Sequence, residues 1–122
     1  MEEYIKIIKS LSEQTRIRIL ALLHQAQEAC VSEIVDTLDE SQYKVSRHLK
    51  VLQDAGMVVG KKKGRWIFYQ LNESQIHFQG LLLTAVKHIS SDILKEDLER
   101  FKKRWAKPIN NKCINGKIES YQ

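Results

Sequence analysis

The chain has 122 residues, of which 43% are hydrophobic and 29% are charged, and these proportions are typical of one soluble globular domain. It has no run of 18 apolar residues and no basic segment followed by an apolar one at its start, so we expect neither a transmembrane helix nor a signal peptide and predict a cytoplasmic protein. Five glycines leave little material for a phosphate-binding loop, and no side chains form a recognisable nucleophile or acid–base motif, so an enzyme is not expected.

Positive charge is concentrated in the middle of the chain. The net charge is +5, but residues 1–40 carry four basic and eight acidic groups. Residues 41–65 carry seven basic groups against one acidic group. Such a focus of charge is typical of a protein that binds the phosphate backbone of nucleic acid. A solvated lysine-rich turn is the alternative for residues 60–64, but it does not explain the basic side chains of residues 41–50.

Three short helices are predicted in the first forty residues. The first covers residues 4–11, where apolar side chains recur every three positions. The second covers residues 13–25 and has Ser12 as its N-cap, and the third follows a Ser32 cap. Residues 39–41 then form a tight turn, so the third helix and the one after it make a helix-turn-helix pair.

The next predicted helix, residues 41–56, has one apolar face and one basic face. Ser41 and Gly56 are suitable residues for its two ends. The apolar stripe consists of Val45, Leu49 and Leu52. The opposite face carries Tyr43, Ser46, Arg47 and Lys50, with Lys44 and His48 on the flanks. An ordinary surface helix is the alternative, but a helix of about 14 residues, roughly 21 Å long, also suits a major groove.

A basic hairpin is predicted after this helix. Residues 57–59 and 65–71 are rich in β-branched and aromatic side chains and are predicted strands. The glycine-bracketed turn between them, residues 60–64, carries three lysines, and Arg65 lies beside it. A helix-turn-helix followed by a basic hairpin is the order of elements in a winged helix-turn-helix. We therefore predict a mostly α fold with a β-hairpin wing.

A long helix with a sustained apolar stripe is predicted from residue 75 to residue 105. It has more apolar face than one small domain can cover, so we expect it to pair with the same helix of a second subunit, with the first helix joining in, in a two-fold symmetric dimer. A helix wrapped over its own core is the alternative. Pro108 ends the helix, and the tail of residues 108–122 is expected to be partly ordered. Residues 1–107 would then form one DNA-binding and dimerisation domain.

Three segments resemble the ArsR/SmtB family of metal-responsive repressors. They are EACVSEIVDTL (28–38), SQYKVSRHLKVLQDAGMV (41–58) and GRWIFYQL (64–71). The resemblance covers roughly residues 3–105. It implies a homodimeric transcriptional repressor that binds an imperfect palindrome in double-stranded DNA and is released when an inducer binds.

The resemblance assigns DNA-reading side chains to the basic helix and to the wing. On the helix they are Gln42, Tyr43, Lys44, Ser46, Arg47 and His48, and on the wing they are Lys61, Lys62, Lys63 and Arg65. Gln42 and Arg47 are side chains that can bind adenine and guanine edges through two hydrogen bonds. The lysines are better interpreted as contacts to phosphates.

The thiol sensor implied by the resemblance is incomplete. Arsenic-responsive members carry Cys-Val-Cys where this chain has Cys30, Val31 and Ser32. Trivalent arsenic binds two or three thiolates, so Cys30 alone cannot form a tight site. The other cysteine, Cys113, lies in a tail similar to those of arsenic-responsive relatives, and an arsenite site made by Cys30 and Cys113, within or between subunits, is one hypothesis. A buried Cys30 with an idle Cys113 is the alternative.

A zinc site on the last helix is a second hypothesis from the resemblance. Zinc-responsive relatives use Asp-x-His followed by His-x-x-Glu or His-x-x-His, and here these positions hold Gln75, His77, His88 and Ser91. The two histidines share a face of one helix but lie about 16 Å apart along its axis. Only an antiparallel partner helix could bring His77 of one subunit to His88 of the other. With Gln75 and Ser91 in place of acidic ligands, the site is short of donors for zinc.

Two further hypotheses concern the signal and the partner. The two cysteines could form a reversible disulfide or polysulfide bridge that acts as a switch. A winged-helix module that binds protein instead of DNA would carry acidic or apolar side chains where this chain has basic ones. No cofactor is needed for DNA binding, and the sequence does not distinguish arsenite, zinc, thiol oxidation and the absence of an inducer.

Overall fold

The computed structural model of the chain describes residues 1–73 and 77–106. Its helices are α1 (Glu2–Lys9), α2 (Gln14–Ala26), α3 (Val31–Leu38), α4 (Gln42–Asp54), α5 (His77–Lys87) and α6 (Lys95–Ala106), and its strands are β1 (Ala29–Cys30), β2 (Val58–Lys63) and β3 (Trp66–Leu71). The predicted tail of residues 108–122 and the domain boundary at residue 107 lie outside the described residues. No helix in the described part of the chain is long and apolar enough to cross a membrane.

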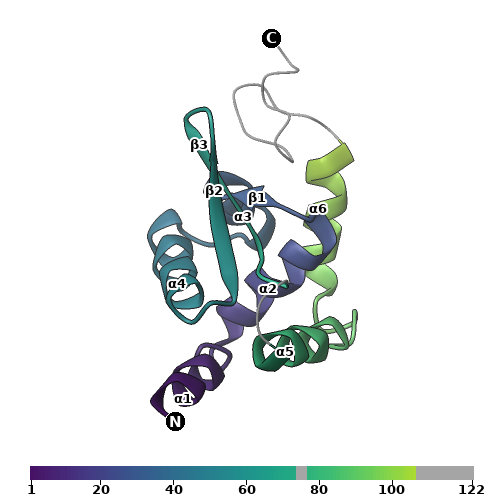
Figure 1. Ribbon diagram of the computed structural model, residues 1–122. Helices are drawn as coiled ribbons and strands as arrows, with labels where there is room; N and C mark the ends of the chain where they lie inside the picture. Colours follow the sequence, from purple (N-terminus) through teal and green to yellow (C-terminus); the bar gives the residue numbers. More distant parts are fainter. Residues whose placement is uncertain (74–76, 107–122) are drawn as a thin grey trace.

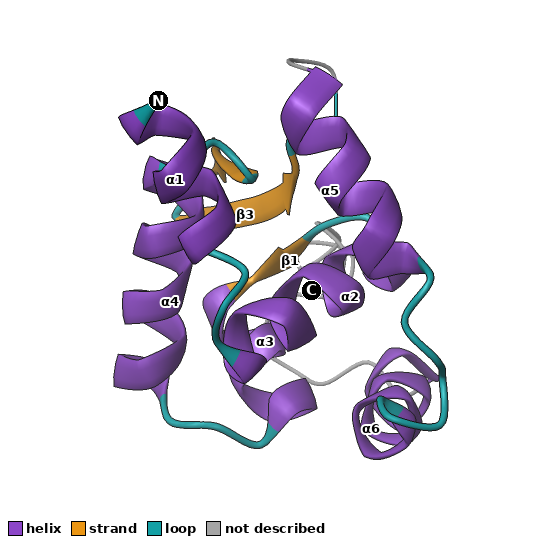
Figure 2. Ribbon diagram, turned by 90° about the horizontal axis from the view of Figure 1, so that it is seen from below, coloured by secondary structure: helices purple, strands orange, loops and turns teal. Residues whose placement is uncertain are grey.

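Helix α2 is the centre of the core. Its side chains Ile19, Leu20 and Leu23 are almost completely buried, and it contacts α3, α4, α5, α6 and β3. Figure 2 shows these helices arranged around α2. Burying one such aliphatic side chain contributes about 1.5–3 kcal/mol relative to leaving it exposed. Because these five elements pack on α2, this helix holds them in one arrangement.

Helices α3 and α4 form the predicted helix-turn-helix. Helix α3 ends at Asp39, which adopts the left-handed conformation with φ of 55°. The Ser41 hydroxyl then accepts a hydrogen bond from the Lys44 N–H at 3.1 Å and caps α4. The chain leaves α4 through Gly56, whose φ is 74°. The prediction of Ser41 and Gly56 as the residues that start and stop this helix is confirmed.

Strands β2 and β3 form an antiparallel hairpin, which we call the wing. Their register runs from Val58 opposite Leu71 to Lys63 opposite Trp66, with Gly64 in the turn at φ of 63°. The short strand β1 pairs with the other edge of β3, so the sheet order is β1-β3-β2. In Figure 1 the tip of the wing extends from the end of the molecule opposite α1 and α5. The fold is therefore a mostly helical winged helix-turn-helix, as predicted.

The C-terminal region contains two helices, so the prediction of a single helix from residue 75 to residue 105 is wrong. Helix α5 ends at Lys87 and α6 begins at Lys95. Between them, the Ser90 hydroxyl accepts a hydrogen bond from the Asp92 N–H at 3.2 Å, and the Ile93 N–H donates to the Ser90 carbonyl. Serine and aspartate compete with helical hydrogen bonds in this way. Helix α6 then folds back against α2 and α3, which is the packing given above as the alternative (Figure 1).

Two predicted helix caps also differ in the structure. Ser12 is not the N-cap of α2, because the Glu13 carboxylate fills that position and accepts hydrogen bonds from two N–H groups of the first turn. Ser32 is not the N-cap of α3. That position belongs to Cys30, and the Glu33 carboxylate accepts a hydrogen bond from the Cys30 N–H at 3.0 Å.

The cap of α4 gives a test of the fold. We expect Ser41→Ala to lower the free energy of unfolding by about 1 kcal/mol, because the first turn of α4 loses a hydrogen-bond acceptor. Chemical denaturation followed by circular dichroism measures this change. Ser46→Ala, an exposed position within α4, is the matched control and should cost nothing. Equal stability of the two variants would mean that the Ser41 hydroxyl does not cap the helix.

Candidate nucleic-acid interface and sensor residues

Helix α4 presents one polar face to solvent and buries the other. The buried side chains are Val45, His48, Leu49 and Leu52, and the exposed ones include Gln42, Tyr43, Ser46, Arg47 and Lys50. The buried face packs on α2 and α3, while the edge of α4 contacts β2 (Figure 1). Packing against the core therefore determines which side chains of this helix are available to a ligand.

The basic side chains of α4 have intramolecular partners. Lys44 pairs with Glu40 at 3.2 Å, and Lys50 pairs with a carboxylate one turn later at 3.2 Å. The Lys50 pair is exposed and contributes about 1 kcal/mol or less, so a phosphate can replace its carboxylate. The Lys44 pair is partly buried, because Glu40 also binds Arg18. The Arg47 guanidinium lies 6.0 Å from the centroid of the exposed Tyr43 ring. These side chains can reach a nucleic acid without disturbing the core.

The wing adds a second group of basic side chains. Lys61, Lys62 and Arg65 are exposed. Lys63 differs, because both carboxylate oxygens of Glu28 accept hydrogen bonds from its ammonium group, at 2.8 and 2.9 Å. In this structure Lys63 ties the wing to the segment before β1, and it would have to leave Glu28 to contact a phosphate.

His48 is buried and does not lie on the exposed face of α4, so its predicted position on the flank of the DNA-reading face is wrong. Its side chain is 2% exposed and points toward the start of α2. The Arg16 Nη1 donates to His48 Nδ1 at 3.1 Å, so the neutral ring carries its proton on Nε2. That nitrogen lies 3.7 Å from a Glu13 carboxylate oxygen. A side chain on the flank of a helical wheel can be either exposed or buried. Here Arg16 of α2 provides the polar partner that makes burial of His48 possible.

Arg16 connects three elements. Besides His48 on α4, it binds the end of α1, because its Nε donates to the Ser10 carbonyl at 2.8 Å and its Nη2 donates to the Lys9 carbonyl at 3.2 Å. Burial lowers the pKa of His48 below its ordinary value of 6.5, while the Glu13 carboxylate acts in the opposite direction. The neutral form of His48 is therefore the one that the folded protein stabilises.

Cys30 lies under the wing at the start of α3. Its side chain is 2% exposed and packs with Phe68, which stands opposite it in the sheet. The Cys30 sulfur lies 3.3 Å from the Ser32 hydroxyl, and Cys30 is disulfide-bonded. The sequence has one other cysteine, Cys113, which lies outside the described residues. Cys30 thus contacts both the wing and the first helix of the helix-turn-helix.

The two histidines predicted as zinc ligands lie at opposite ends of α5 in the sequence. His77 begins α5, and its side chain lies outside the described residues, as does Gln75. His88 follows α5, is exposed, and its Nδ1 lies 2.9 Å from the Thr84 carbonyl. Among residues 1–73 and 77–106, no three histidine, cysteine or acidic side chains form a group that could hold a metal ion. A site shared by two subunits stays a prediction.

Two arginines of α2 contribute to this region, although no motif in the sequence marks them as functional. Arg16 supports α4 through His48, and Arg18 contacts the turn between α3 and α4 through Glu40 at 3.1 Å. Their positions in the sequence could have indicated this role, because both arginines lie beside the apolar stripe of a buried helix. A charged side chain in such a position needs a polar partner.

Known proteins match this chain over most of its length. Residues 13–59 match the family model described as bacterial regulatory protein, arsR family. The chain is 32% identical over 105 residues to the arsenic resistance transcriptional regulator ArsR2 of Pseudomonas putida, and this alignment covers 86% of the chain and 91% of that protein. This chain belongs to the ArsR/SmtB family.

Two other matches agree with the fold and the class of function. The arsenical resistance operon repressor of Escherichia coli is 40% identical over 68 residues, 56% of this chain and 58% of that protein. The structure described as reduced HlyU from Vibrio cholerae N16961 is 26% identical with a TM-score of 0.57, over 72% of this chain and 92% of that one. As an ArsR/SmtB member, this protein is a DNA-binding transcriptional repressor and not an enzyme.

The exposed face of α4 gives a test of DNA contact. We expect Arg47→Ala to weaken binding to operator DNA by roughly 1–3 kcal/mol, because Arg47 is the exposed side chain best suited to a guanine edge. Fluorescence anisotropy of a labelled duplex at fixed salt measures the affinity. Lys102→Ala removes the same charge from the exposed side of α6 and should bind like the wild type. Wild-type affinity of the Arg47 variant would exclude that side chain from the interface.

The buried histidine gives a test by pH. The unfolded chain takes up a proton on His48 near pH 6.5, whereas the folded protein resists protonation to lower pH. The free energy of unfolding should therefore fall as the pH is lowered from 6.5, with a slope from this one group of at most about 1.4 kcal/mol per pH unit. His48→Gln should show a smaller slope between pH 7.5 and 5.5. A wild-type slope in His48→Gln would contradict this assignment.

Proposed function

We propose that this protein is a homodimeric repressor that binds an imperfect palindromic operator through α4 and the wing and is released when arsenite binds at Cys30. The observation that carries the DNA-binding part is the exposed, basic face of α4 beside the basic wing. Helix α4 has 13 residues, a length of about 20 Å, which suits a major groove.

The proposed contacts divide into two kinds. Gln42 and Arg47 are exposed on the outer face of α4 and would read base edges. Lys61, Lys62 and Arg65 on the wing would contact phosphates, which supply affinity and salt dependence instead of sequence preference. Tyr43, Lys44 and Ser46 lie on the same side of α4 and are proposed as supporting contacts, whereas Lys63 would contribute only after leaving Glu28.

Exposed apolar side chains on α1 and α5 support a dimer. They are Tyr4 (49% exposed), Ile5 (42%) and Ile8 (50%) on α1 and Leu81 (69%) on α5. The two helices touch, because the Tyr4 and Phe78 rings stand edge to face with centroids 5.0 Å apart. Both lie at the end of the molecule opposite the tip of the wing (Figure 1). A second copy that covers this surface by two-fold symmetry would leave both α4 helices free for DNA.

Two features support Cys30 as the sensor. The relatives in Pseudomonas putida and Escherichia coli are named for arsenic and arsenical resistance, and arsenite requires more than one thiolate. Since Cys30 precedes α3 directly and pairs with β3, a ligand on its sulfur would shift the helix-turn-helix relative to the wing. A coupling of about 1–3 kcal/mol is enough for regulation.

Thiol oxidation is the second candidate signal. It is favoured by the disulfide at Cys30 and by the likeness to a structure described as reduced HlyU. In this version two thiols lose two protons and two electrons to an oxidant and form the sulfur–sulfur bond. Zinc at His77 and His88 stays a prediction, because its ligands would come from two subunits.

The arsenite proposal is tested by release from DNA under a phosphine reductant, which removes oxidation as a cause. We expect stoichiometric arsenite to release the wild-type protein from a labelled duplex of its own upstream region. Cys30→Ser should bind the duplex normally and stay bound in arsenite, because one ligand is lost. Ser32→Ala, a control that changes the hydroxyl next to the sulfur, should be released like the wild type.

Two results would contradict the proposal. Normal release of Cys30→Ser by arsenite would remove Cys30 from the sensor. If the wild type binds DNA tightly and arsenite does not release it, the protein is a repressor but arsenite is not its inducer. Addition of an oxidant to the same complex would then test thiol oxidation as the signal.

A further inference from the structure

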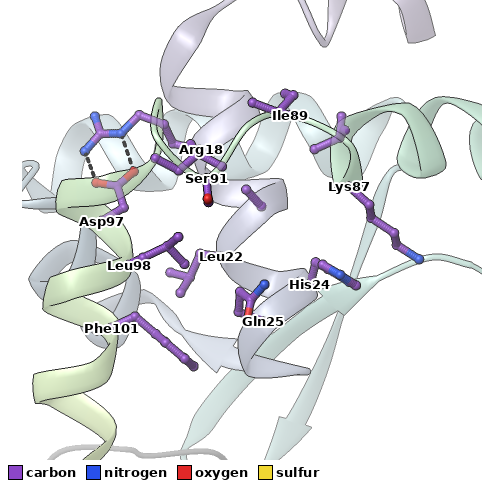
Figure 3. A pocket seen from close by; sticks show the side chains of 13 residues that line it. Arg18, Leu22, His24, Gln25, Lys87, Ile89, Ser91, Asp97, Leu98 and Phe101 are labelled. Atoms are coloured by element: carbon purple, nitrogen blue, oxygen red, sulfur yellow. Dashed lines mark hydrogen bonds and ion pairs between the residues drawn. The ribbon is translucent and has the colours of Figure 1, made fainter.

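A pocket lies on the side of the molecule formed by α2, the 88–94 connection and α6. Its volume is about 150 Å³. Figure 3 shows Leu22 of α2 facing Leu98 and Phe101 of α6 across its middle. The pocket exists because α6 folds back over α2, so it was not predictable from a continuous C-terminal helix. A cavity of about 150 Å³ with aliphatic and aromatic walls can hold a molecule the size of benzene.

The two ends of the pocket differ in their polar groups. At one end, Arg18 and Asp97 bind each other through two hydrogen bonds of 2.8 Å, so their charges are satisfied. At the other end lie His24, Gln25 and Lys87 (Figure 3). Within the described part of the chain, no hydrogen bond engages the side chains of His24 and Gln25. This end therefore offers hydrogen-bond donors and positive charge to a ligand.

Lys87 can exchange its present partner. Its ammonium group lies 2.6 Å from a carboxylate oxygen of Glu73, and the side chains of Lys87 and Glu73 are 26% and 56% exposed. Because water reaches the Glu73 carboxylate, the carboxylate of a ligand can replace it. The apolar middle and the cationic end together suit a small molecule with a ring and one negative group.

We propose that this pocket binds a small aromatic or branched organic acid, with its apolar part between Leu22, Leu98 and Phe101 and its carboxylate at His24 and Lys87. This site is distinct from Cys30 and from the exposed face of α4. Small-molecule sites of this kind combine mostly apolar walls with a few polar groups that orient the ligand.

Arg18 gives the pocket a physical connection to the DNA-binding helix. Besides pairing with Asp97 on α6, the Arg18 guanidinium donates hydrogen bonds to the Leu38 carbonyl at 2.6 Å and to the Glu40 carboxylate at 3.1 Å. Glu40 in turn pairs with Lys44 of α4 at 3.2 Å. These contacts join α6 to the end of α3 and the turn before α4.

A ligand between α2 and α6 would therefore affect DNA binding. Pressure on Leu98 moves Asp97, its neighbour in α6, away from Arg18. The turn before α4 then loses its connection to α6, and operator affinity falls. This regulatory step rests on the proposed DNA binding by α4, whereas the binding of the acid does not.

Benzoate is the probe for the site. We expect a saturable 1:1 titration of the full chain with benzoate, followed by two-dimensional NMR, with the largest shifts at residues of the pocket. Benzylamine, which has the same ring and the opposite charge, should bind at least tenfold more weakly. Leu98→Trp fills the pocket and should abolish benzoate binding. Ile93→Trp, an exposed position of the 88–94 connection outside this pocket, should bind benzoate like the wild type.

The outcomes separate the pocket from the proposed function. Absence of saturable binding, or unchanged binding by a folded Leu98→Trp protein, would overturn the site. Saturating benzoate should weaken operator binding by about fivefold or more in the wild type and leave it unchanged in Leu98→Trp. Benzoate binding without any effect on operator affinity would overturn the connection through Arg18. Failure to bind DNA even without benzoate would contradict the proposed function, while the NMR titration still decides the site.

Discussion

The apolar face of α4 packed on α2 is the contact on which the rest of this structure depends. Val45, Leu49 and Leu52 are buried there, so the basic side chains of α4 can point only to solvent. The same packing aligns α4 with the wing, whose strands begin directly after it. Without this contact, the chain would still carry its basic side chains, but these side chains would no longer form one continuous surface with the wing. The interface for DNA is in this sense a consequence of the hydrophobic core.

Arg16 and Arg18 extend that packing to the parts of the molecule that can receive a signal. Arg16 joins the end of α1 to His48 on the buried side of α4, and Arg18 joins α6 to the turn before α4. The hydrogen bonds of Asp97 raise the pKa of Arg18 even further above its ordinary value, so this guanidinium stays charged at every pH of interest. A change at the proposed dimer surface or at the α6 pocket can thus reach the position of α4 through a short series of contacts.

Much of the fold could be predicted from the sequence, because amphipathic periodicity and turn residues are local signals. Ser41, Gly56 and the apolar stripe of α4 are examples, and the presence of the wing followed from its β-branched residues. The predicted turn of residues 60–64 is wrong, because strand β2 continues to Lys63 and the turn is at Gly64. The break at Ser90 could not be predicted, because the apolar stripe continued through it and α6 became stable only by folding back on α2 and α3. The burial of His48 also depended on a distant partner, Arg16. Local patterns do not reveal contacts between residues far apart in the chain.

The most direct test of the central claim is a dimethyl sulfate footprint of the reduced protein on its upstream DNA, because this reagent methylates guanine N7 in the major groove. Two copies of α4 in a two-fold symmetric dimer predict two patches of protected guanines, separated by about one helical turn or 10–10.5 base pairs. Protection of a single patch, or an unchanged methylation pattern on a duplex that the protein binds, would contradict the docking of α4 in the major groove.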